Sequence, residues 1–261
     1  MNDALTARAE GRIENWQSAH GFRTLKGGAN ERCGLSPTLK GGAHERSSYG
    51  AGRGIFNERM SELEGLNLTV AITGASGAVL CRELLRALEG DSRVARVHFV
   101  ASENSLRVIA EELGVSGRTG LLEKLLGSAP AKITQHSDSD VGASIASGSY
   151  PSNGMIVLPC SMGTLAAIAN GLANSLIARA ADVTLKERRP LLLCVRETPF
   201  NRIHLRNMSL AAEAGAVIFP VIPAFYNKPV DSTEMARQFA FRVLAHVGLA
   251  QTGSYVWKAE E

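Results

Sequence analysis

The chain has 261 residues and a formal net charge of +3 at pH 7, with its basic residues dispersed. This weak charge argues against a nucleic-acid partner and favours anionic small molecules as ligands. No uncharged apolar run reaches about 18 residues, so no membrane span is predicted, and the N-terminus lacks the apolar core of a secretory signal. Four cysteines without CxxC or Cys/His ligand spacing indicate reduced thiols, a cytoplasmic protein and no structural zinc.

Residues 1–65 differ from the rest of the chain, because they are polar, rich in glycine and without apolar periodicity. A nine-residue unit at 24–32 recurs almost unchanged at 38–46. Two copies are too few for a stacked repeat architecture, which needs about three. The composition predicts a disordered extension, and Met60 is a candidate for the natural start of the protein.

The folded part is expected at 66–250, with a C-terminal tail at 251–261, and its first strand is an apolar run at 68–72. The glycine-rich turn TGASGA at 73–78 leads into an amphipathic helix. Glycines allow a ligand close to the backbone, and the N-terminus of this helix is expected to offer unpaired N–H groups to an anion. This pattern is common to nucleotide- and flavin-binding folds and does not choose between them.

A second strand is expected at 97–101 and ends at Ser102. A fold that binds NAD usually has an acidic residue at this strand end, so Ser102 weakens the NAD interpretation without excluding it. A helix at 105–113 and a short amphipathic segment at 121–126 follow. The stretch 136–140 contains histidine and aspartates that could bind a metal, but acidic residues in such a stretch commonly cap turns and helices.

The most informative stretch lies between two apolar strands, at 155–158 and 191–195. A turn of small residues at 160–164 and two helical segments rich in Ala and Leu separate them. A basic cluster begins at Lys186, and the charged pair Arg196–Glu197 follows the second strand. Ligands of open α/β sheets bind where strands end, so chemistry explains these charges better than packing does.

The remaining elements complete an alternation of strands and helices. A polar loop at 147–149 is suited to line a pocket, and a helix at 202–214 precedes a short strand at 216–219. A loop with three prolines at 220–229 leads to a last helix, at 231–246, which Asp231 is expected to cap. The alternation predicts an α/β fold with a parallel sheet covered by helices on both faces.

Four segments resemble the UbiX-type flavin prenyltransferases, a family earlier described as aromatic-acid decarboxylases. They are TGASGA at 73–78, ASGS at 146–149, the stretch from PCSMGT to RETP at 159–199, and PAFYNKP at 223–229. The resemblance implies a Rossmann or flavodoxin-like domain that joins the dimethylallyl group of dimethylallyl phosphate to N5 and C6 of reduced FMN, without a metal. It also implies a dodecamer with active sites at subunit junctions. The product of the reaction, prenylated FMN, would serve a UbiD-type decarboxylase in ubiquinone biosynthesis or aromatic-acid breakdown.

The resemblance also implies roles for residues at matching positions. Those expected to contact FMN are Gly74, Ala75, Ser76, Ser102, Ser161, Met162, Gly163, Thr164 and Arg179. Those expected to hold the prenyl phosphate are Lys186, Arg196, Tyr226 and Arg242. The catalytic residues would be Glu197 and Ser76, which handle protons, together with Lys186, and Trp257 would close the site of a neighbouring subunit.

The chemistry needs residues of these types. Cleavage of an allylic C–O bond leaves a phosphate anion, which fixed cations stabilise, and bond formation at an aromatic carbon needs a proton acceptor such as Glu197. Prenyl transfer from a diphosphate typically uses Mg²⁺ on an aspartate-rich motif. The chain has no DDxxD sequence, which is consistent with metal-free use of a monophosphate.

Other interpretations make different demands on the sequence. A flavin-dependent cysteine decarboxylase would carry a PASANT-type motif where this chain has PCSMGT, and a short-chain dehydrogenase would need a Tyr-x-x-x-Lys pair that is absent. An FMN-binding accessory protein without turnover would need no second phosphate site. Individual residues also have plainer explanations. Arg196–Glu197 would be a surface ion pair, Arg188, Arg189 and Arg237 solvated or interface residues, and Cys160 and Cys194 small core residues.

Overall fold

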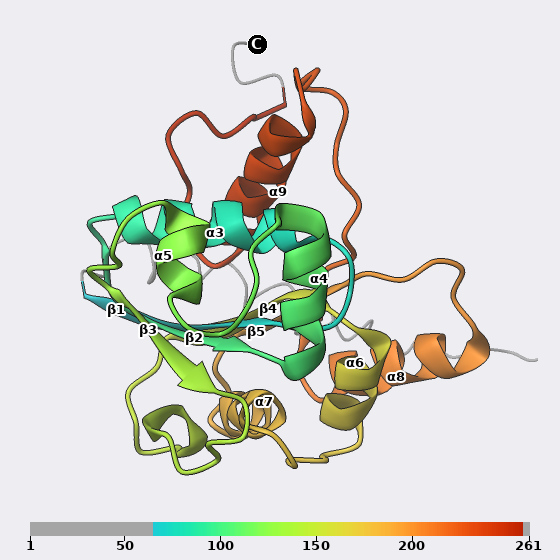
Figure 1. Ribbon diagram of the computed structural model, residues 1–261. Coiled ribbons are helices and arrows are strands. Elements are labelled where there is room, and N and C mark those ends of the chain that lie inside the picture. The colour runs from blue at the N-terminus through green and yellow to red at the C-terminus, as the bar shows by residue number, and fades with distance from the viewer. Residues whose placement is uncertain (1–64, 258–261) are drawn as a thin grey trace, which may run out of the picture. The chain divides into compact units, whose positions relative to one another are not determined.

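The computed structural model describes residues 65–257, so the expected disordered extension, its repeat and Met60 lie outside the described residues. Within them, six strands form one sheet in the order β3-β2-β1-β4-β5-β6, and all neighbouring pairs are parallel (Figure 1). The strands are β1 (Leu66–Ile72), β2 (Val94–Ala101), β3 (Ile133–Ser137), β4 (Gly154–Cys160), β5 (Leu191–Val195) and β6 (Val217–Ile218).

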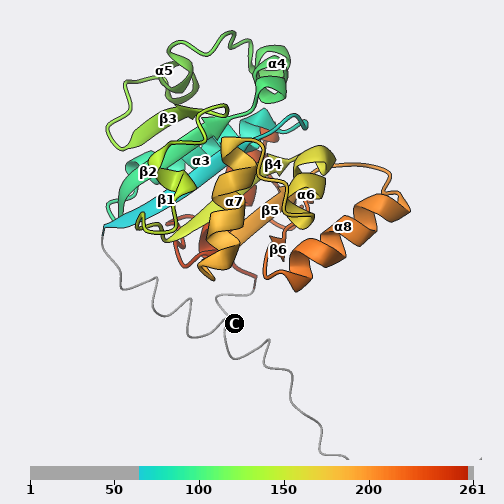
Figure 2. The ribbon, with the colours of Figure 1, turned by 90° about the horizontal axis from the view of Figure 1, so that it is seen from below.

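Helices cover both faces of this sheet, so the predicted three-layer α/β architecture is confirmed. One face carries α3 (Ala78–Gly90), α4 (Glu103–Leu113), α5 (Leu121–Leu126) and α9 (Ser232–His246). Figure 2 shows the other face, with η1 (Ser144–Ala146), α6 (Met162–Ala169), α7 (Leu176–Lys186) and α8 (Arg202–Glu213). None of the helices in the described part of the chain is long and apolar enough to cross a bilayer.

The central strands β4 and β5 are buried along their whole length because helices cover both faces of the sheet there. Side chains on the two faces of the sheet pack into two separate hydrophobic cores. Phe99 belongs to the core on the α3 face, and Leu193 belongs to the core on the α7 face. Cys160 and Cys194 are fully buried, as predicted for core residues. Burial raises the pKa of the Cys160 thiol to about 12, so it is protonated and unreactive at neutral pH.

Strand β3 was not expected from the sequence, because it lies at the sheet edge and carries polar residues. Its His136 Nε2 lies 2.8 Å from Nδ1 of His98, and Nε2 of His98 lies 2.7 Å from the Tyr150 hydroxyl. His136, which the sequence offers as a metal ligand, is therefore part of a hydrogen-bonded series with His98 and Tyr150. Residues 65–257 contain no group of three His, Cys, Asp or Glu side chains that could hold a metal ion.

The strand order reverses between β1 and β4, which is where ligands bind in open α/β sheets. Both strands are central, and the loops that follow them lie on the same edge of the sheet (Figure 1). The fold thus places the TGASGA turn next to the turn that opens α6.

Candidate functional site

The turns that follow β1, β2 and β4 are fastened together at the carboxyl edge of the sheet. The Thr73 hydroxyl donates to the carbonyl of Pro159 at 2.9 Å and accepts from the N–H of Ser161 at 2.7 Å. The N–H of Ser102 donates to the carbonyl of Ile72 at 3.0 Å. These bonds bring together three of the segments that the sequence predicts to contact FMN.

The first of these turns presents Gly74 and Ser76 to solvent, while Ala75 between them is buried. A Cβ atom on Gly74 would lie 2.6 Å from the Cβ of Asn104. Glycine is therefore required here so that the turn can approach the first turn of α4. Ser76, two residues further on, is exposed.

The N-terminus of α3 does not offer its N–H groups to a ligand, contrary to the sequence-based expectation. The carboxylate of Glu112 on α4 accepts from the N–H of Gly77 at 3.1 Å and from the N–H of Ala78 at 2.7 Å. The Glu112 carboxylate therefore occupies the position that an anionic ligand would take at the N-terminus of α3. These two N–H groups are not available to an anionic ligand.

The N-terminus of α6 offers a position for an anion. Ser161 caps this helix, and its hydroxyl oxygen accepts from the N–H of Thr164 at 3.3 Å. The N–H groups of Met162 and Gly163 have no hydrogen-bond partner within residues 65–257, and no atom lies within 4 Å of the place that a Cβ on Gly163 would take. The Met162 side chain is buried in the core. Free N–H groups, the helix dipole and open space fit an anionic group such as the FMN phosphate.

Arg196 and Glu197 lie beside this turn, since the N–H of Arg196 donates to the carbonyl of Cys160 at 3.1 Å. They do not form the surface ion pair that was the plainer explanation. Glu197 instead accepts from the N–H of Thr198 at 3.0 Å, and the exposed guanidinium of Arg196 has no partner among the described residues. An unpaired cation next to a free helix N-terminus can bind a second anion.

Arg179 lies in the first half of α7. This helix begins near the same edge, because the N–H of Leu176 donates to the carbonyl of Asp138 just after β3. The Arg179 guanidinium donates to the carbonyl of Ala146 at 3.2 Å and pairs with Asp182 at 2.8 Å. Arg179 therefore already supports the loop before β4, and its half-exposed side chain retains donors for a ligand.

Lys186 is not brought to the other phosphate-binding candidates within one chain. It ends α7, and β5 runs from nearby Leu191 toward Arg196, so Lys186 lies at the opposite edge of the sheet. Its ammonium group forms an ion pair with Glu187 and lies over the loop at Gly148.

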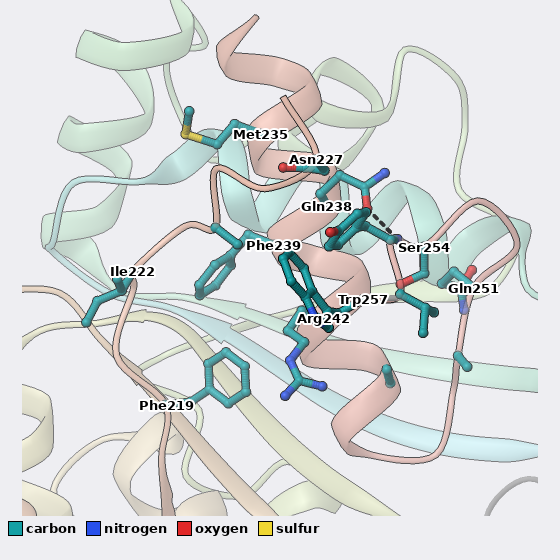
Figure 3. A pocket seen from close by; sticks show the side chains of 15 residues that line it. Phe219, Ile222, Asn227, Met235, Gln238, Phe239, Arg242, Gln251, Ser254 and Trp257 are labelled. Atoms are coloured by element: carbon teal, nitrogen blue, oxygen red, sulfur yellow. Dashed lines mark hydrogen bonds between the residues drawn. The ribbon is translucent and has the colours of Figure 1, made fainter. Parts of the chain in front are cut away.

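Tyr226, Arg242 and Trp257 form a third group on the part of the molecule that carries α9. This helix is flanked by the loop at 219–231 and the segment at 247–257, as Figure 1 shows. They enclose a cavity of about 610 Å³ that Arg242 and Trp257 line (Figure 3). The Tyr226 and Trp257 rings meet edge to face, with centroids 4.9 Å apart.

Two of the expected surface arginines differ in environment. Arg237 on α9 is exposed as predicted and pairs with Glu234. Arg189 is not simply solvated, since it is partly buried and donates to the carbonyls of Gly148 at 2.8 Å and Tyr150 at 3.0 Å. A sequence pattern cannot distinguish these cases, because the acceptors of Arg189 are backbone atoms about forty residues away.

Comparisons with known proteins agree with this geometry. A parallel sheet with an open anion site at its switch point defines a flavin- or nucleotide-binding protein, and the family described as Flavoprotein matches residues 57–238. Flavin prenyltransferase UbiX of Salmonella typhimurium is 46% identical over 177 residues, which cover 68% of this chain and 89% of the relative. Flavin prenyltransferase UbiX of Deinococcus radiodurans is 41% identical over 194 residues, which cover 74% and 94%.

Two solved structures extend the comparison. The crystal structure of AnUbiX (PadA1) in complex with FMN and dimethylallyl pyrophosphate has a TM-score of 0.68 and 40% identity, and the match covers 76% of this chain and 100% of that one. A dodecameric FMN-dependent UbiX-like decarboxylase from Escherichia coli O157:H7 has a TM-score of 0.67 and 39% identity, with 74% and 100% covered. The chain belongs to the UbiX flavin prenyltransferase family.

Proposed function

We propose that this chain prenylates reduced FMN, joining the dimethylallyl group of dimethylallyl phosphate to N5 and C6 of the flavin. The structural observation that carries the proposal is the free N-terminus of α6 beside the unpaired guanidinium of Arg196, which provides for two anionic groups at one edge. A protein that only stores FMN needs one such site. The family membership and the ligands named for the AnUbiX structure support the same reaction.

The carboxyl edge would hold the flavin. The N–H groups of Met162 and Gly163 would donate to the FMN phosphate, with Ser161 and Thr164 keeping the turn in shape. Gly74, Ala75, Ser76, Ser102 and Arg179 would complete this part of the site. FMN supplies the nucleophilic N5 and C6 atoms. The chain supplies the position of the flavin and the charges around it.

The leaving phosphate would be stabilised by Arg196, Arg242 and Lys186, with the Tyr226 hydroxyl as a further donor. Ring closure adds one proton to the alkene of the prenyl group and removes one from C6. Glu197 would accept the proton released at C6, and Ser76 would take part in relaying protons. The separation of these residues in one chain supports a site completed by neighbouring subunits, with Trp257 closing a neighbour's site. A dodecamer, as named for the Escherichia coli relative, would provide such junctions.

The product would pass to a UbiD-type decarboxylase. The described cysteines, Cys81, Cys160 and Cys194, are all free thiols, which supports action in the cytoplasm, where thiols stay reduced.

Mass spectrometry of the flavin after anaerobic incubation with reduced FMN and dimethylallyl phosphate tests the proposal. We expect the flavin mass to increase by one C5 prenyl unit. Unmodified FMN, with its binding to the protein verified, would instead identify an FMN-binding accessory protein. A parallel incubation with dimethylallyl diphosphate shows which donor the enzyme uses.

A further inference from the structure

The loop that precedes β4 lies directly against Lys186, although the two are far apart in sequence. A Cβ atom on Gly148 would lie inside van der Waals contact of the Lys186 ammonium nitrogen and of the Glu187 carboxylate. Only the absence of a side chain at Gly148 permits the two charged groups to lie where they do. The loop and the turn after α7 therefore fit each other at this residue.

This loop is held at several points. Arg189 donates to the carbonyls of Gly148 and Tyr150, at 2.8 and 3.0 Å. The Tyr150 hydroxyl is hydrogen-bonded to the buried His98 at 2.7 Å. Because Arg189 follows Lys186 by three residues, the segment that carries the ammonium group also fastens the loop on which that group rests.

Glu187 completes the arrangement from the other side. Its hydrogen bond to Lys186, the charge of Lys186 and the charge of Arg189 all lower the pKa of the Glu187 carboxyl, so it is an anion at neutral pH. An ammonium group has three N–H donors. With one of them directed to Glu187, the others remain available to a phosphate in a fixed direction.

We infer that Gly148 and Arg189 are positioning residues, which fix the Lys186 ammonium group by supporting it on the loop before β4. The inference rests on the proposed function, in which Lys186 binds the prenyl phosphate. The three atoms nearest to a methyl group at position 148 would all belong to the flexible side chains of Lys186 and Glu187, and the φ angle of Gly148 is outside the left-handed region. Alanine there should therefore displace the ammonium group without unfolding the protein.

The test is a double-mutant cycle of Gly148→Ala with Lys186→Met, in the full chain and with oligomeric state checked for each variant. For Gly148→Ala alone we expect the KM for dimethylallyl phosphate to rise about tenfold, with the Kd for FMN unchanged. In the Lys186→Met background, Gly148→Ala should have no further effect. Gly90→Ala is the matched control, because a Cβ there would meet nothing within 4 Å.

Equal effects of Gly148→Ala in both backgrounds, or no effect in either, would overturn the inference. An unchanged KM for Lys186→Met would overturn it too, while leaving prenylation itself established. Failure of the unmodified chain to prenylate FMN overturns the proposed function instead. Arg189→Met should raise the KM in the same way, and Arg189→Lys, which retains one donor group, should recover part of the loss. If Arg189→Met does not fold, the Gly148→Ala cycle still decides the matter.

Discussion

At the residue scale, the site combines side chains whose polar atoms are all hydrogen-bonded within the protein with side chains whose polar atoms have no such partner. Thr73 is buried, and its hydroxyl serves as donor and acceptor at once, which joins the exits of β1 and β4. The Arg196 backbone is held by the carbonyl of Cys160, but its guanidinium has no partner within residues 65–257. Side chains whose hydrogen-bonding groups are all paired within the protein hold the turns in place. Side chains with unpaired hydrogen-bonding groups remain available to bind substrate.

Replacing Glu197 by glutamine should leave FMN binding intact and stop prenylation. The amide cannot accept the proton that must leave C6, and loss of such a base typically costs about 10²- to 10⁴-fold in rate. The Kd for FMN and the rate of prenylated FMN formation are the quantities to measure. Glu123→Gln, at an exposed position of α5, is the matched control. An unimpaired rate in Glu197→Gln would remove this carboxylate from the mechanism.

Arg242→Ala should mainly weaken binding of the prenyl phosphate. Loss of a hydrogen bond to a charged group costs about 1.5–3 kcal/mol, which corresponds to a rise of about 10- to 150-fold in the KM. A titration with dimethylallyl phosphate at saturating FMN measures it. Arg237→Ala, in the same helix but paired with Glu234 at the surface, should leave the KM unchanged. Similar effects of both variants would indicate damage to α9 rather than loss of a phosphate ligand.

At the element scale, the ends of helices decide where an anion can bind. The N-termini of α3 and α6 both follow central strands at the same edge, yet Glu112 caps the first and only Ser161 caps the second. The choice between them depends on a carboxylate that α4 places beside α3. For this reason we assign the FMN phosphate to α6.

Elements β2, β3 and the loop before β4 are joined through His98, and this connection predicts a dependence of stability on pH. Burial, then the charges of His136 and Arg96, lower the pKa of His98 to about 4. The unfolded chain binds a proton near the ordinary value of about 6.5, so it binds more protons than the native state at mildly acidic pH. The contribution of neutral His98 to the stability of the native state is therefore complete above about pH 6.5 and is lost as the pH falls toward 4.

The free energy of unfolding, measured with urea between pH 7 and pH 4, should therefore fall by up to about 3 kcal/mol in the unmodified protein. His98→Gln cannot titrate, so its stability should be lower at pH 7 but change less across this range. The hydrogen bond to Arg93 lowers the pKa of Asp91 to about 2. Asp91 therefore changes the free energy of unfolding only below about pH 4, and does so in both proteins. Parallel pH profiles for the two proteins would contradict the role given to His98.

At the scale of the whole molecule, one chain contains all the expected site residues but holds them in three places. The carboxyl edge has Arg196, the opposite edge has Lys186, and the part around α9 has Arg242. A rigid sheet with helices on both faces cannot bring these places together by small movements. In our proposal, assembly of several copies would bring the three parts together into one site.

A chain that begins at Met60 should fold, bind FMN and turn over as the full chain does. The family match begins at residue 57, and both cores are built from residues beyond 65. Thermal unfolding and the rate of prenylated FMN formation, compared with the full chain, are the measurements. An insoluble or inactive product would show that residues 1–59 have a role in folding or activity.

The sequence by itself determined the α/β class, five of the six described strands, and the positions of Ser161, Arg196 and Glu197 at strand exits. These follow from local patterns, because an apolar run and the turn after it are adjacent in the chain. Only the tertiary structure decided that Glu112 closes the N-terminus of α3, that Arg189 supports the loop at Gly148, and that β3 pairs at the sheet edge. Each of these depends on partners that are distant in the sequence, and the physical reason is that hydrogen bonds and close packing are set by distance in space.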